Sequence, residues 1–141
     1  MYLPAEVQYA IIHHSYETIS QFIERMNKYT TIEAEELKKE GYIFNWKDLF
    51  EKPLSEFLSR YFANSGYKDG LHGLALSFLQ AFSFLVVYLK LWEIGKFKEY
   101  QINLEELNSQ KDKSEKTIDY WIKKSDQSGD LFGRLFKKFK G

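Results

Sequence analysis

The 141-residue chain contains no cysteine, only two prolines and no excess of either charge. Without cysteine there is no disulfide scaffold, no thiolate zinc site and no cysteine nucleophile. Twenty basic residues balance twenty acidic ones, so the formal net charge is zero. Proteins that bind duplex nucleic acid carry surplus positive charge against the phosphates, and we therefore expect no nucleic-acid partner. The length fits one domain, or one domain with tails.

Charged residues are also absent from one long internal stretch, because residues 70–89 contain no Asp, Glu, Lys or Arg. As a helix, this stretch would rise about 30 Å, which is the thickness of a bilayer core. His72, Gln80 and two serines make it an imperfect membrane span. Three interpretations stay open, namely an interfacial helix, a buried core helix and a spanning helix, and we favour them in that order.

Aromatic residues are abundant, at 18% of the chain, and the charge is unevenly distributed. Residues 1–130 carry a net charge of −4, whereas Leu131–Gly141 carries +4 and alternates Phe and Leu with Arg and Lys. An anionic lipid surface attracts such a segment with about 1 kcal/mol per cation near the surface. The composition therefore predicts an anionic membrane surface as a partner.

The N-terminal part predicts one strand and one helix. Apolar and polar side chains alternate within residues 1–14, which favours a short strand. Apolar side chains spaced by three and four residues predict an amphipathic helix over Tyr16–Tyr29, with Ser15 as its N-cap.

Two more helices follow from their start and stop residues. Thr30 or Thr31 would cap a second helix over Ile32–Glu40, and Gly41 would end it. Pro53 would begin the next helix, since proline is tolerated in a first helical turn.

The rest of the chain predicts a long apolar helix and a polar tail. The apolar helix runs from Leu71 to about Phe97, with Asp69 as a plausible N-cap. Residues 103–130 predict a mobile tail with one or two exposed helices, and Ser125–Asp130 predicts a flexible joint. The expected fold class is mainly α: a short N-terminal strand, three or four helices of which one is long and apolar, and a basic amphipathic C-terminal helix.

Motifs of a complete active site are missing from the sequence. It has no P-loop, no G-x-S-x-G and no D-x-D carboxylate pair, and the His13-His14 pair has no nearby cluster of metal ligands. From the residues alone, the chain contains no self-contained catalytic site.

Two ordered blocks nevertheless carry recognisable motifs. The first, residues 11–37, has an H-x-S-Y element followed by Arg25, Asn27, Lys28, Tyr29, Thr30 and Ala34. The second, residues 57–93, contains Phe57, Tyr61, Gly66, Asp69, Gly70 and Gly73. Together they resemble the C-terminal portion of bacterial family 2 glycosyltransferases of the GT-A type, which build lipopolysaccharide cores and other surface glycans. Arg25 stands where that family often has Lys, and Lys28 replaces the commoner Arg.

The resemblance implies a domain organisation and a set of site residues. Residues 1–14 would end a catalytic GT-A domain whose D-x-D carboxylates and base would precede Met1, residues 15–100 would form a helical membrane-associating region, and residues 101–141 a polar tail with a basic amphipathic end. His13 would be a ligand of a divalent metal, Mg or Mn, held only in the whole enzyme. The implied substrate-binding residues are Tyr16, Arg25, Lys28, Tyr29 and Asp69.

The implied activity is transfer of a sugar from a nucleotide-sugar donor to a lipid-linked or lipopolysaccharide acceptor. This segment would supply the acceptor-side wall and peripheral attachment to the cytoplasmic face of the inner membrane, with the catalytic domain in cis or in trans. Alone, the chain would be inactive. The alternative is a non-enzymatic helical module that binds a membrane surface or a partner. A D-x-D-containing reading frame directly upstream would distinguish the two.

Overall fold

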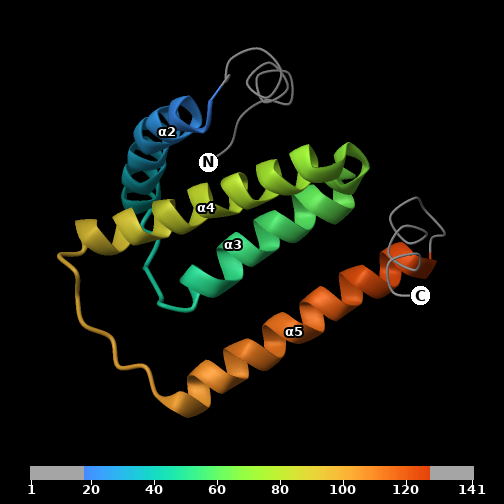
Figure 1. Cartoon of the computed structure of the whole chain (residues 1–141). Coiled ribbons are helices and arrows are strands. Elements are labelled where there is room, and N and C mark those ends of the chain that lie inside the picture. The colour runs from blue at the N-terminus through green and yellow to red at the C-terminus, as the bar shows by residue number, and fades with distance from the viewer. Residues whose placement is uncertain (1–17, 128–141) are drawn as a thin grey trace. The chain divides into compact units, whose positions relative to one another are not determined.

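The computed structural model describes residues 18–127, which are mainly helical and contain no strand (Figure 1). The elements in chain order are α2 (Ile19–Lys39), α3 (Asp48–Leu58), the π-helical turn η2 (Ser59–Ala63), the 3₁₀ turn η3 (Gly66–Asp69), α4 (Gly70–Ile94) and α5 (Leu104–Gln127). The mainly α class with one long apolar helix is thereby confirmed. The strand expected within residues 1–14 and the basic helix expected over Leu131–Gly141 lie outside the described residues.

The described chain forms two compact units. One combines residues 18–44 with 86–98, and the other combines residues 45–85 with 99–127. Helix α4 is continuous and contributes residues to both. In the first unit, Phe22 and Met26 of α2 and Val87 of α4 are buried. The sequence analysis placed a boundary near residue 100, between the helical membrane-associating region and the polar tail. That boundary is not the one between these two compact units, and it stays a prediction.

Helix α2 corrects the expectation of two separate helices. Thr18 is its N-cap and accepts a hydrogen bond from the Gln21 amide at 3.1 Å. The helix then continues through Thr30 and Thr31, whose hydroxyls donate to the carbonyls of Met26 and Asn27, four residues earlier, at 2.8 and 2.9 Å. A threonine that bonds back along its own helix does not cap a new one.

The end of α2 follows the sequence. Gly41 adopts a φ of +84°, directly after the C-cap Glu40, and terminates the helix as predicted.

Helix α3 begins five residues before Pro53, so the prediction that proline starts this helix is wrong. The start is fixed by side chains instead. Asp48 is buried and accepts a hydrogen bond from the Asn45 amide at 3.0 Å, while the Asn45 side chain accepts one from the Lys47 amide at 2.9 Å. Pro53 lies in the second turn, where it cannot donate the hydrogen bond to the Leu49 carbonyl and its ring crowds that carbonyl.

After α3 the backbone widens into η2, where the Asn64 amide bonds to the Ser59 carbonyl at 2.8 Å, five residues back. Ser65 then takes a left-handed conformation, with φ of +62°, and the chain turns back through η3 into α4.

The glycines of the second motif block allow a close backbone contact at this turn. A Cβ atom on Gly73 would overlap the carbonyl oxygen of Gly66. A Cβ on Gly66 would lie 2.8 Å from the Arg60 carbonyl oxygen, and Gly70 has a φ of +61°. The motif glycines therefore let α4 pack directly on the preceding turn.

The first half of helix α4 buries small and polar side chains and exposes large apolar ones, whereas Val87, Tyr88 and Leu91 in its second half are buried. Among its buried residues are Gly73, Ser77, Gln80 and Ser83. Leu71, Phe78 and Phe82, spaced by seven and four residues, share the opposite face and are 80%, 59% and 46% exposed. A helix in the core of a soluble protein has the reverse arrangement.

Helix α5 agrees with the expectation of one or two helices within residues 103–130, and it is a single continuous helix over residues 104–127. The Asn103 side chain caps it by accepting a hydrogen bond from the Glu106 amide at 2.7 Å. Trp121 stacks on Phe62 at 6.2 Å between ring centroids, and the helix runs past Ser125 to Gln127, where a joint was expected. Contact with α3 and η2 therefore organises a sequence that looks solvated.

We predict that Gly73→Ala strongly destabilises the protein, by more than about 3 kcal/mol, because the new methyl group would displace the Gly66 backbone. Gly95→Ala is the matched control, since its Cβ would meet neighbouring carbonyls only at 3.4 and 3.8 Å. Urea unfolding followed by circular dichroism measures both. Equal and small changes would contradict the close approach of these two glycines.

Candidate functional site

The most connected polar group in the first unit is the Lys90 ammonium. It donates to four oxygen atoms of α2: the Asn27 carbonyl at 2.6 Å, Asn27 Oδ1 at 2.7 Å, Thr30 Oγ1 at 2.9 Å and Thr31 Oγ1 at 2.7 Å. An ammonium has three protons, so the four oxygens share them. All four acceptors are uncharged groups, and Lys90 is thus held without a carboxylate.

This oxygen cage joins the two motif blocks of the sequence. Asn27 and Thr30 belong to the first block, and Lys90 belongs to the second. Their side chains meet across about sixty residues of chain. The motif residues Asn27 and Thr30 therefore have a structural role, because their side chains hold Lys90. The sequence analysis did not predict this role.

The predicted substrate-binding residues are divided between the two units. Arg25, Lys28 and Tyr29 lie on exposed positions of α2, spaced so that they share a side of the helix. Asp69 belongs to the other unit, where it is exposed at the end of η3, directly before α4. Tyr16 and His13 lie outside the described residues. Their substrate and metal roles stay predictions.

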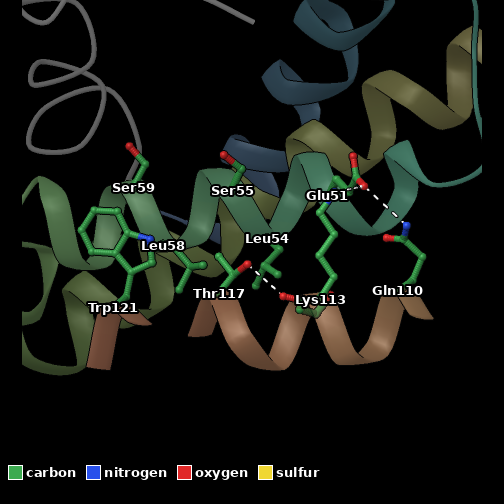
Figure 2. Close-up of a pocket in the computed structure, with 10 residues that line it drawn as sticks. Glu51, Leu54, Ser55, Leu58, Ser59, Gln110, Lys113, Thr117 and Trp121 are labelled. Carbon is green, nitrogen blue, oxygen red and sulfur yellow. Dashed lines mark hydrogen bonds and ion pairs between the residues drawn. The ribbon is translucent and has the colours of Figure 1, made fainter. Parts of the chain in front are cut away.

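A pocket of about 260 Å³, named here the α3–α5 pocket, lies between α3 and α5 in the second unit (Figure 2). Glu51 of α3 bonds to Lys113 Nζ at 2.8 Å and also accepts a long hydrogen bond, of 3.5 Å, from Gln110 Nε2. The hydrogen bond from Lys113 holds the pKa of the Glu51 carboxyl below its usual value. The ion pair therefore stays charged at neutral pH and has no net charge.

Hydroxyl groups and apolar side chains line the rest of this pocket. The hydroxyls belong to Ser55, Ser59, Ser114 and Thr117, and the apolar walls are Leu54, Leu58 and Trp121. Thr117 donates to the Lys113 carbonyl at 2.9 Å. Figure 2 shows the Ser55 and Ser59 side chains on the side of α3 that points away from α5.

One atom in the lining has no partner among the described residues. Gln110 is 5% exposed, and its Oε1 is a buried acceptor without a hydrogen bond. A buried acceptor left unpaired costs about 1–3 kcal/mol.

An apolar groove of about 470 Å³ lies between α3, α4 and α5 of the same unit. Phe57 and Phe78 form part of its wall, with ring centroids 4.7 Å apart, and Ile118 and Ile122 contribute from α5. Burial raises the pKa of the Tyr61 phenol at this groove. Phe78 also belongs to the exposed apolar face of α4, so groove and face adjoin.

Residues 18–127 contain no group of three or more His, Asp or Glu side chains that would hold a metal ion. A Mg or Mn site completed by His13 stays a prediction for the whole enzyme.

The sequence analysis predicted neither the oxygen cage nor the α3–α5 pocket. One feature of the sequence could have drawn attention to Lys90, which is the first charged residue after the uncharged stretch. No sequence feature indicates that Glu51 meets Gln110 and Lys113, because about sixty residues separate them and no motif connects them.

Comparison with known proteins adds no assignment. No family model, no curated protein and no solved structure matches the chain.

We predict that Lys90→Met destabilises the first unit by about 1.5–3 kcal/mol, because several charge-assisted hydrogen bonds disappear and their acceptors remain. Lys28→Met removes the same charge from an exposed position of α2 and is the control. Hydrogen exchange of the α2 amides measures both. Unchanged protection in Lys90→Met would show that the cage contributes little.

Proposed function

We propose that this protein attaches to a membrane surface through the apolar face of α4. The observation that carries the proposal is the orientation of this helix, with small polar side chains inside and Leu71, Phe78 and Phe82 outside. Helices that pack in lipid bury small residues and present large apolar ones to the acyl chains. Contiguous exposed apolar surface of this kind marks an interaction site.

Burial along the helix supports the same proposal. Residues Gly66–Ile94 are long and apolar enough to cross a membrane, yet only 39% of the most apolar 18-residue window is buried. The core helix of a soluble protein would be mostly buried. Gln80 and two serines on the inner face favour an interfacial position over a full span.

The sequence supplies an electrostatic part of this attachment. Leu131–Gly141 carries four cations and no anion, and it lies outside the described residues. Attraction of this segment to anionic lipid is screened by salt. The apolar and electrostatic contributions to membrane binding can therefore be separated by varying the salt concentration.

We predict that the chain co-sediments with liposomes containing anionic lipid and that high salt releases it only in part. Leu71→Ser with Phe82→Ser should weaken binding about 30–700-fold, because each exposed side chain contributes about 1–2 kcal/mol when it enters the interface.

The matched control is Ile43→Ser with Leu104→Ser. These two side chains are 84% and 83% exposed but lie outside α4, so binding should change little. A folded chain that does not pellet at low salt, or two double variants that lose binding equally, would refute attachment through α4.

We further propose that this membrane module serves a family 2 glycosyltransferase and works at the cytoplasmic face of the inner membrane. In support, residues of both motif blocks meet in the structure: Asn27 and Thr30 hold Lys90, while Gly66 packs against Gly73. In this proposal the segment provides the acceptor-side wall, and the catalytic domain binds the nucleotide-sugar and metal. The non-enzymatic module is the alternative.

We predict that His13→Ala lowers sugar transfer about 10²–10³-fold in the protein that carries the catalytic domain. The reason is that His13 would complete a metal site that stabilises the leaving diphosphate. His14→Ala is the control, because adjacent strand residues point to opposite faces. Rates at saturating metal and donor measure both. Equal, mild effects would favour the non-enzymatic alternative.

A further inference from the structure

We infer that the apolar groove between α3, α4 and α5 takes up one acyl chain of a lipid from the membrane surface. The inference rests on the proposed attachment through α4 and deepens it, because it names a second, specific contact with the lipid. Its evidence is the lining, the size and the position of the groove.

The lining of the groove offers almost no hydrogen-bonding group. Nine of its ten lining side chains are hydrocarbon, and Tyr61 is the one lining residue with a polar side chain. An extended peptide would bring backbone N–H and C=O groups against this surface and leave them unpaired, which is costly. An alkyl chain has no such groups, so the lining favours a lipid chain over an extended peptide.

The walls of the groove are only partly covered by the protein itself. Leu58 and Ala81 are buried. Phe57 of α3 and both Ile118 and Ile122 of α5 are half-buried, so apolar surface stays open to water. Covering such surface with an apolar ligand is favourable, and the effect grows with the area that is covered.

The volume of the groove suits a single chain. It is about 470 Å³. Since a cavity of about 150 Å³ holds one benzene ring, the groove has room for up to about eighteen carbon atoms. One acyl chain of a common membrane lipid has this size, whereas two chains would not fit.

The groove adjoins the apolar face that α4 presents. Phe78 is 59% exposed on that face and also forms part of the groove wall, with its ring centroid 4.7 Å from that of Phe57. Phe78 and all the other lining residues belong to the second unit, so groove and face are continuous within one unit. A lipid chain in contact with Phe78 therefore reaches the groove directly.

The test uses the full chain and lysophosphatidylcholines with octanoyl, decanoyl, dodecanoyl and tetradecanoyl chains, below micelle-forming concentrations, in isothermal titration calorimetry. The zwitterionic headgroup carries no net charge that would attract the basic segment Leu131–Gly141. We expect an affinity that rises about two- to fourfold with each added methylene, and a negative heat-capacity change. Glycerophosphocholine, the same headgroup without a chain, should not bind. No binding of any of these lipids, or an affinity independent of chain length, would overturn the inference.

Ile122→Trp tests whether the groove is the site of binding. The larger apolar side chain would fill the groove, so we expect at least about tenfold weaker lipid binding together with an unchanged or higher melting temperature. Leu107→Trp is the matched control, because Leu107 is a partly exposed apolar residue of the same helix that does not line this groove. It should leave lipid binding unchanged.

If Ile122→Trp binds these lipids as well as the native chain does, the alkyl site lies elsewhere and the inference fails. If the native chain is dimeric and binds no lipid, whereas Ile122→Trp sediments as a monomer, a second copy covers the groove and the inference fails as well. Should Ile122→Trp not fold, Ile118→Trp is the second variant, with the same expected loss of binding.

A further pair of measurements separates this inference from the membrane attachment on which it rests. Leu71→Ser with Phe82→Ser changes the exposed face of α4 and leaves the groove lining intact. We therefore expect this double variant to lose liposome binding and to keep its affinity for dodecanoyl lysophosphatidylcholine. Ile122→Trp should do the reverse. A double variant that loses both activities would assign alkyl binding to the exposed face and overturn the role of the groove.

Discussion

The structure depends on the inner face of α4, where small side chains let other backbone come close. Gly73 touches the Gly66 carbonyl, and Ser77 bonds back to the Gly73 carbonyl at 2.8 Å, so its hydroxyl is satisfied inside its own helix. In the first half of α4 this face carries small residues, whereas in its second half Val87, Tyr88 and Leu91 are buried. Both units draw residues from this helix.

Sequence reasoning found the helices where local signals and tertiary contacts agree. Gly41 ends α2 as expected, and the long apolar helix lies within three residues of its predicted ends. The predicted helix boundaries were wrong where hydrogen bonds outside the local motif determine where a helix begins or continues. Thr30 looks like a cap, but within α2 its hydroxyl helps to hold Lys90, sixty residues away. Pro53 looks like a start, but the Asn45–Asp48 hydrogen bonds begin α3 earlier.

The same limit applies more strongly to the sites. The exposed apolar side chains of α4 could be located from the sequence, because they lie within the uncharged residues 70–89. The α3–α5 pocket could not be predicted from the sequence, because Glu51, Gln110 and Lys113 are common surface residue types and meet only when α5 lies beside α3. Helix α5 has few apolar residues, and its register on α3 is set by one ion pair and one aromatic stack, which composition does not reveal.

The π-helical turn Ser59–Ala63 places one more residue in its turn than an α-helix would. Residues after this turn are therefore rotated by about 100° relative to a regular continuation of α3. Phe62 lies within the turn and stacks on Trp121 of α5. In evolutionary terms, the loss of a single codon within this turn would make the helix more regular but would shift Phe62 relative to Trp121. The contact with α5 would therefore select against changes in the length of this turn.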